Sequence, residues 1–311
     1  MELTVTGNQG LTQQRGLVEL NARFIAYLDA KESTVETYSK AMRPFFSYLA
    51  DNGITRPTRE TVIAYRDSIR ARLKPSTVQT YIITLRLFFA WTAQEGLYPN
   101  VAEHIKGAKL DRQHKKDALT GSQAKAVLQG IERDTLAGKR DFAILALMTS
   151  CGLRTIEVAR ATIADMRNAG ESAALYLQGK GRDERTEYVK LAEPVEAAIR
   201  DYLKARGKAE GKEALFTSTS NNNAGQALTT RSISGIVKEA MRAAGMDSER
   251  LTAHSLRHTA ATLNLLNGGS YPETQQLLRH RNLSTTMIYD HALSRANNDS
   301  EARIAAVIFE T

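Results

Sequence analysis

Apolar residues recur with helical spacing along most of this chain. In segment 76–97 the positions that follow the helical period of about 3.6 residues are Val78, Tyr81, Ile82, Leu85, Phe88 and Phe89. Helical patterns also mark 11–30, 57–73, 118–132, 141–152 and 231–245. Only 173–178 and 186–191 resemble strands, and they flank the glycine- and charge-rich turn 179–185. The pattern predicts a mainly helical protein with one small antiparallel sheet in its second half.

The first hundred residues contain an internal repeat. Segments 33–54 and 76–97 align without gaps at an offset of 43 residues, and ten of their 22 positions are identical. Each copy opens with Ser-Thr, which is an N-cap signal, and closes on Gly53 or Gly96. Two copies are too few for a solenoid. We therefore expect two similar helices within one small bundle.

Length and charge suggest two domains and an anionic partner. The chain has 311 residues and a formal net charge of +8, and segment 104–116 carries five basic side chains against one acidic one. We expect an N-terminal tail at 1–20, a helical domain at 21–106, a basic linker at 107–117, a second, mostly helical domain at 118–296 and a C-terminal tail at 297–311.

The composition argues against export and membrane insertion. The N-terminus lacks a signal-peptide pattern, and no apolar run reaches the length of about 18 residues that a spanning helix needs. The single cysteine, Cys151, lies in an apolar run, so we expect it to be a core residue in a protein of the reducing cytoplasm, associated with the nucleoid.

Three basic residues open the helix predicted from Ala253 onward. His254 and Arg257 project from one side of that helix, and His258 lies four residues after His254. Zinc would suit a histidine pair of this spacing, but a permanent cation stands between the two rings, so an anion is the better ligand. We expect no metal and no cofactor. For His258 a satisfied core histidine is the default interpretation, and the sequence leaves its role open.

A second cluster follows in 270–292. Ser270 and Glu273 form a capping-box pattern, and Ser284 can cap the next helix. His280 lies at the end of the first of these short helices. Tyr289 lies about one turn into the second.

Five blocks in this order resemble the tyrosine recombinase (phage integrase) family. They are the paired "STVxTY" helices, "CGLRTIEVARATIADM", "LQGKGRDERTEYVKL", "LTAHSLRHTAAT" and "LLRHRNLSTTMIYDHA". The resemblance extends from about residue 20 to 291. It implies a SAM-like, core-binding helical domain followed by a mixed, mostly helical catalytic domain with a small antiparallel sheet. The chain is similar to the compact Xer-like members and to integrases of small mobile elements.

The resemblance also implies a role for each matched residue. Tyr289 would attack a DNA phosphodiester to give a 3′-phosphotyrosyl link, and Lys180 would protonate the leaving 5′-oxygen. The phosphate would be bound by Arg154, His254, Arg257 and His280, and Glu157 would orient Arg154. Arg279 departs from the family, which usually has glycine before this histidine. If the position needs a positive φ, arginine is costly there; alternatively, the helix ends differently or Arg279 contacts DNA.

DNA binding is expected of basic residues in both domains and the linker. The candidates are Arg59, Arg66, Arg70, Lys106, Lys109, Arg112, Lys115, Lys116 and Arg279. For the three arginines of 57–73, a solvated basic face is the alternative interpretation. Two further alternatives for the whole chain are a type IB topoisomerase, which relaxes DNA, and a catalytically silent DNA-binding regulator.

The resemblance implies partners as well. We expect double-stranded DNA with inverted-repeat core sites, and a cyclic tetramer in which tail 297–311 docks on a neighbouring protomer. An accessory DNA-bending protein or a partner recombinase could take part. The sequence leaves open whether the role is integration and excision of a mobile element or resolution of chromosome or plasmid dimers.

Overall fold

The protein divides into two compact units. The structure, a computed structural model, describes residues 11–110, 117–178, 184–287 and 299–309, and its units comprise Met1–Gln113 and His114–Thr311. The division falls inside the segment expected to be a linker. Each unit has its own apolar core. No helix in the described ranges is long and apolar enough to cross a membrane.

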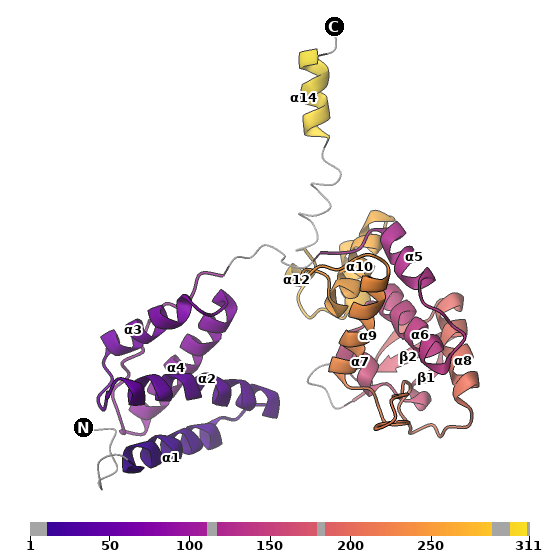
Figure 1. Ribbon diagram of the computed structural model, residues 1–311. Helices are drawn as coiled ribbons and strands as arrows, with labels where there is room; N and C mark the ends of the chain where they lie inside the picture. The colour runs from indigo at the N-terminus through magenta and orange to yellow at the C-terminus, as the bar shows by residue number, and fades with distance from the viewer. Residues whose placement is uncertain (1–10, 111–116, 179–183, 288–298, 310–311) are drawn as a thin grey trace. The chain divides into compact units, whose positions relative to one another are not determined.

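Unit 1 is a helical bundle (Figure 1). Its helices are α1 (Leu11–Tyr27), α2 (Glu32–Asp51), α3 (Arg59–Arg70) and α4 (Pro75–Gln94). Helix α2 contacts α1 and α4, and α3 contacts α4. The two copies of the repeat are α2 and α4, so the prediction of two similar, neighbouring helices is confirmed.

The repeat is visible in how α2 and α4 pack. Phe45 of α2 contacts Phe89 of α4, with ring centroids 6.0 Å apart and an interplanar angle of 83°. Phe46 contacts Phe88 at 5.7 Å and 79°. Because residues 45 and 88 are equivalent in the repeat, as are 46 and 89, these two edge-to-face contacts are the same contact made twice. Such aromatic pairs stabilise beyond the area that they bury.

The two helices begin and end alike. Both start one residue before the serine, at Glu32 and Pro75, and have no side-chain cap, so the predicted N-capping was wrong. The predicted glycine ends were right. Gly53 and Gly96 have φ of +63° and +65°, and the amide after each donates to the carbonyl five residues earlier at 2.8 Å. This is the hydrogen-bond pattern of a Schellman motif.

The segment after α4 folds back on unit 1. Arg59 Nη1 donates to the Glu103 carbonyl at 2.5 Å, and Arg66 Nη1 donates to the Lys106 carbonyl at 3.1 Å. A Cβ on Gly107 would lie 3.3 Å from Gln79 Cα and would displace the end of the Gln79 side chain, so the segment passes close to α4 here. The chain therefore remains attached to unit 1 through the first part of the expected linker.

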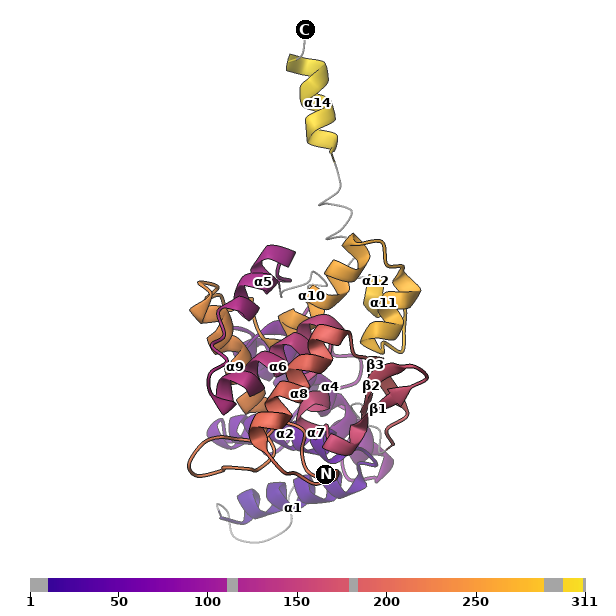
Figure 2. The same ribbon diagram turned by 90° about the vertical axis from the view of Figure 1, so that its right-hand side faces the viewer.

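Unit 2 is built around α6 (Figure 2). Its elements are α5 (Gly121–Gln129), α6 (Leu136–Cys151), α7 (Thr155–Arg160), η1 (Ile163–Asp165), β1 (Met166–Ala169), β2 (Ser172–Leu177), β3 (Glu187–Lys190), α8 (Glu193–Arg206), α9 (Thr230–Ala243), α10 (Ala253–Leu266), α11 (Tyr271–Leu278), α12 (Ser284–Met287) and α14 (Ser300–Phe309). Helix α6 contacts α5, α8, α9 and α10.

Cys151, the last residue of α6, is 3% exposed, and burial raises the pKa of its thiol to about 11. The prediction that this cysteine is a core residue is confirmed.

The sheet has three antiparallel strands in the order β1-β2-β3. Strands β2 and β3 are the predicted pair, whereas β1 was not predicted. Leu175 pairs with Val189 and is fully buried, while the neighbouring pair, Tyr176 and Tyr188, has ring centroids 5.3 Å apart. One face of the hairpin thus covers the core of unit 2.

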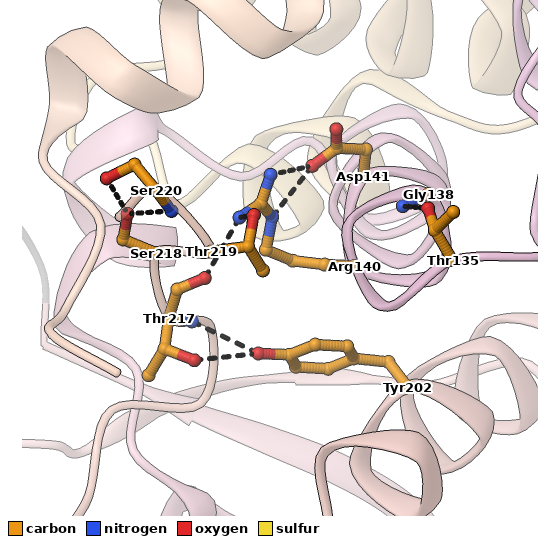
Figure 3. A network of polar contacts seen from close by, with 9 residues as sticks. All are labelled: Thr135, Gly138, Arg140, Asp141, Tyr202, Thr217, Ser218, Thr219 and Ser220. Carbon is orange, nitrogen blue, oxygen red and sulfur yellow. Dashed lines mark hydrogen bonds and ion pairs between the residues drawn. The ribbon is translucent and has the colours of Figure 1, made fainter. Parts of the chain in front are cut away.

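A buried arginine fastens the polar loop after α8 to α6 (Figure 3). Arg140 is 6% exposed and donates to the Thr217 carbonyl and Thr219 Oγ1, each at 3.1 Å. Its Nε donates to Asp141 at 2.8 Å, and Tyr202 shares a hydrogen bond with the Thr217 hydroxyl at 3.1 Å. These bonds satisfy a buried cation and connect α6, α8 and the loop.

Replacing Gly96 by alanine should lower the free energy of unfolding of unit 1 by about 1 kcal/mol, because a left-handed conformation is disfavoured for residues with a Cβ. No atom lies within 4 Å of the added Cβ, so the cost is conformational. The matched control is Gly96→Asn, which should lose less because asparagine tolerates this region. Urea unfolding followed by the fluorescence of Trp91, the single tryptophan, measures both. Equal stability of the alanine variant and the wild type would contradict the expectation.

Candidate active site

The site begins at the turn between α6 and α7. Gly152 ends α6 with a φ of +60°, and a Cβ there would lie 2.7 Å from Leu278 Cδ2. Glycine therefore serves two needs, the left-handed turn and the close approach of the end of α11. The turn leads directly to Arg154, at the N-terminal end of α7.

Glu157 is the anion at the centre of the site. Its side chain is fully buried and accepts hydrogen bonds from Arg154 N at 2.7 Å, Arg154 Nη1 at 2.8 Å and Arg279 Nη2 at 2.8 Å. Burial by itself would raise the pKa of Glu157. The charge of Arg279 and the hydrogen bonds from both arginines outweigh it and hold the pKa below its ordinary value. The carboxylate is thus ionised at neutral pH and orients two guanidinium groups.

Arg257 lies between α6 and α11 and is 1% exposed. Its Nη1 donates to the Gly152 carbonyl at 2.5 Å, and its Nη2 donates to the Leu278 carbonyl. Helix α10 is itself held by a hydrogen bond of 2.8 Å from the Leu119 amide to Thr259 Oγ1. Arg257 therefore connects the end of α6, which leads to Arg154, with the end of α11, which leads to His280.

The two histidines of α10 differ in burial. His254 is exposed, whereas His258 is 4% exposed and meets the His254 ring edge to face, with centroids 4.5 Å apart. His258 is therefore a core residue, a question that the sequence left open. Within the described ranges, no three His, Cys, Asp or Glu side chains are grouped as a metal site would require.

His280 is fixed at its backbone and its ring. Its amide donates to the Gln275 carbonyl at 3.1 Å, and its carbonyl accepts from Gln275 Nε2 at 3.0 Å. Its Nδ1 lies 3.0 Å from Oγ1 of Thr286, which is fully buried on α12. If the hydroxyl donates, the neutral ring carries its proton on Nε2, which can then donate to a ligand.

Positive charges surround His280. Together, burial and neighbouring charges lower the pKa of His280 to about 4. Burial has the largest effect, followed by the charges of Arg257, Arg154, Arg279 and His254. These groups come from the start of α7, from α10 and from the end of α11. The structure therefore brings α7 and α10, which are distant from His280 in the sequence, to one imidazole.

Arg279 occupies the position at which the family usually has glycine. Its φ is +53°, so the residue does adopt the left-handed conformation that the sequence analysis considered costly. Its side chain is 4% exposed and is directed to Glu157, and it offers little surface to DNA in this conformation. The capping box of Ser270 and Glu273 that begins α11 is confirmed.

The other site residues fall into two groups. Residues outside the described ranges are Lys180, Tyr289, Arg112, Lys115 and Lys116. Lys106, Lys109, Arg59 and Arg70 are exposed on unit 1, and the Arg66 side chain is 17% exposed. Arg66 and Arg70 also pair with Asp67 at 2.9 and 3.5 Å. Arg66 and Arg70 therefore form ion pairs within α3, in addition to any contact that they make with DNA.

A hollow of about 490 Å³ lies beside His280, between β3 and α11. It is lined by Thr186, Glu187, Tyr188, Pro272, Gln275, Gln276, Arg279, His280 and Arg281. Thr186 follows directly on the predicted turn 179–185, so one end of that turn lies at the site. Sequence reasoning missed the hollow, and it also missed Thr286 and Gln275, which carry no motif signal of their own.

The ring of His280 should titrate near pH 4, far below an ordinary histidine. Because the folded pKa is depressed, His280 contributes stability that is complete above about pH 6.5 and is lost as the pH falls through about 4. NMR of the imidazole resonances measures the midpoint, and a His280→Gln spectrum identifies the signal. A midpoint at or above 6.5 would contradict this.

Comparisons with known proteins show which family the two halves of the chain resemble. The profile of the phage integrase family matches residues 117–295, and that of the phage integrase N-terminal SAM-like domain matches 22–96. Tyrosine recombinase XerC of Caldanaerobacter subterraneus subsp. tengcongensis is 35% identical over 209 residues, which are 66% of this chain and 54% of that protein. A tyrosine recombinase of Synechocystis sp. is 27% identical over 275 residues, 83% and 86% of the two chains.

Solved structures show the same fold. XerH recombinase bound to its difH substrate, in a pre-cleavage complex, has a TM-score of 0.74 at 19% identity and covers 95% of this chain and 99% of its own. A lambda integrase tetramer bound to a Holliday junction has a TM-score of 0.68 at 16% identity, covering 88% and 76%. The chain spans 54% and 64% of the length of the first two curated relatives.

Proposed function

Because the chain belongs to the phage integrase family, we propose that it is a site-specific recombinase that breaks and rejoins DNA strands through a tyrosine. The observation that carries the proposal is the cluster of positive charge from Arg154, Arg257 and His254 around the half-buried ring of His280. An arrangement of guanidinium and imidazole donors suits a phosphodiester, whose transition state gathers negative charge on the non-bridging oxygens. Relatives that carry recombinase names favour this function over a topoisomerase.

The proposed reaction needs no cofactor. The Tyr289 oxygen attacks phosphorus, the bond to the 5′-oxygen breaks, and Lys180 donates the proton that this oxygen takes up. The products are a 3′-phosphotyrosyl link and a free 5′-hydroxyl. Rejoining reverses the step, with the 5′-hydroxyl of another strand as nucleophile and Tyr289 as leaving group.

The described residues have distinct parts in this reaction. Arg154, whose side chain is 29% exposed, remains accessible for a phosphate oxygen while Glu157 fixes one of its nitrogens. Neutral His280 would donate its Nε2 proton without adding a charge to a site that already holds several. His254 would exchange the proton of the tyrosine hydroxyl, from the exposed start of α10.

The proposed partner is double-stranded DNA with inverted-repeat core sites. We assign the phosphate contacts of unit 1 to Lys106, Lys109 and Arg70, which are exposed, and to the remaining donors of Arg59 and Arg66. The basic residues Arg112, Lys115 and Lys116 would extend these contacts between the units. Binding of this kind weakens steeply with salt, because each neutralised phosphate releases counterions.

Wild-type protein should form a covalent adduct with a nicked suicide DNA substrate, and Tyr289→Phe should form none while it binds the same DNA. The phenylalanine lacks only the attacking oxygen, so binding should be unchanged. Denaturing electrophoresis of labelled DNA detects the adduct, and mapping the trapped end identifies the target site. An adduct formed by Tyr289→Phe would contradict the assignment of Tyr289 as the nucleophile. If the wild-type protein formed no adduct, the proposed reaction would be wrong.

Helix α14 supports self-assembly as part of the proposal. None of its residues is buried, and Ile304, Val307, Ile308 and Phe309 are 59%, 85%, 63% and 80% exposed. Apolar surface of this kind marks an interaction site. We assign it to a neighbouring protomer, in a tetramer on two DNA sites.

Val307→Asp should abolish the pairing of two DNA sites but leave binding to a single site within about twofold, because a charge cannot be buried in an apolar contact without a partner. Ala302→Asp adds the same charge away from Val307 and Ile308, on the side of α14 that carries Phe309, so it should leave single-site binding intact and impair pairing less than Val307→Asp does. Native gel electrophoresis separates single-site complexes from paired ones. Normal pairing by Val307→Asp would exclude this helix from the interface.

A further inference from the structure

Arg279 has an unusual combination of features for a residue beside an active site. Its backbone is left-handed, and in the described ranges His104 is the only other residue besides glycine with a positive φ. Its side chain, 4% exposed, points inward. Nothing in the turn itself requires an arginine, since glycine would adopt this conformation with less strain. The contacts of the guanidinium must therefore account for the residue.

Those contacts join the two catalytic arginines. Arg279 Nη2 lies 2.8 Å from Glu157 Oε2 and 3.3 Å from the Gly152 carbonyl. Glu157 holds Arg154 through its other oxygen at 2.8 Å, and the Gly152 carbonyl also accepts from Arg257 Nη1 at 2.5 Å. Arg279 thus touches both groups by which Arg154 and Arg257 are held. It also donates through Nη1 to the Leu277 carbonyl at 2.5 Å, which fixes its own direction.

The balance of charge also depends on Arg279. Without Arg279, the buried Glu157 carboxylate would accept hydrogen bonds only from the guanidinium and the backbone amide of Arg154, and its ionised form would be costly. The second cation, Arg279, offsets that cost. With Arg279 present, Glu157 remains an anion while Arg154 contributes only Nη1 and its backbone amide to it.

We propose that Arg279 is a positioning residue, which holds Glu157 in place and thereby fixes the orientation of Arg154 toward the scissile phosphate. A glycine at this position could contribute to the site only through its backbone, whereas Arg279 contributes its side chain. The inference rests on the proposed function for the identity of the phosphate, but the Arg279–Glu157–Arg154 arrangement can be tested without it.

The first test is single-turnover cleavage of the suicide substrate at saturating protein. Arg279→Gly keeps the turn and should slow cleavage at least tenfold with DNA affinity within twofold, and Arg279→Lys should restore part of the rate. Glu157→Gln should slow cleavage as well, and the double variant Glu157→Gln/Arg279→Gly should be no slower than Glu157→Gln alone, because both changes disturb one arrangement. A wild-type rate for Arg279→Gly, or losses that multiply in the double variant, would overturn the proposal.

The second test does not depend on cleavage. In ¹⁵N-labelled protein the guanidinium of Arg154 should rotate slowly, and Arg279→Gly should make its rotation measurably faster by NMR; unchanged rotation would overturn the proposal. An absent adduct in the wild type together with faster Arg154 rotation would count against the proposed function alone. His104→Gly relieves the same backbone strain in unit 1 and serves as the stability control: it should raise thermal stability and leave Arg154 unchanged. A change at Arg154 in this control would also count against the proposal.

Discussion

The charge of one buried carboxylate holds the site together. Guanidinium groups repel one another and are costly to bury, so three of them near one imidazole require an anion among them. Glu157 supplies it, with one oxygen toward Arg154 and the other toward Arg279. The same network includes the Gly152 carbonyl, which binds Arg257. The Glu157 carboxylate thus has two effects. It reduces the repulsion and the burial cost of the guanidinium groups, and its hydrogen bonds fix the directions of Arg154 and Arg279.

Much of the fold followed from local patterns, and the exceptions have physical reasons. The aromatic positions of the repeat predicted α2 and α4, because burying one face of a helix leaves a period in the sequence. Strand β1 could not be found in this way, since its four residues pair with β2 and carry little pattern of their own. Helix α8 did carry a signal, with Val195, Ile199 and Tyr202 buried at helical spacing, and could have been recognised.

The site was predictable in its residue types and less so in its contacts. Motifs identified Arg154, His254, Arg257 and His280, but no pattern indicated that Arg257 would donate to the carbonyls of Gly152 and Leu278. Backbone acceptors have no sequence signature. The inward direction of the Arg279 side chain likewise depends on where Glu157 lies, which is a tertiary fact.

The hydrogen bond between His280 and Thr286 couples two events that are usually treated as separate. Thr286 lies on α12 (Ser284–Met287), so any displacement of this helix would also move the hydroxyl that faces the imidazole. Losing that hydroxyl would free Nδ1 and let the ring exchange its proton between the two nitrogens. The tautomer of His280 would then report the position of α12, because Nε2 is held as a hydrogen-bond donor only while Thr286 faces Nδ1.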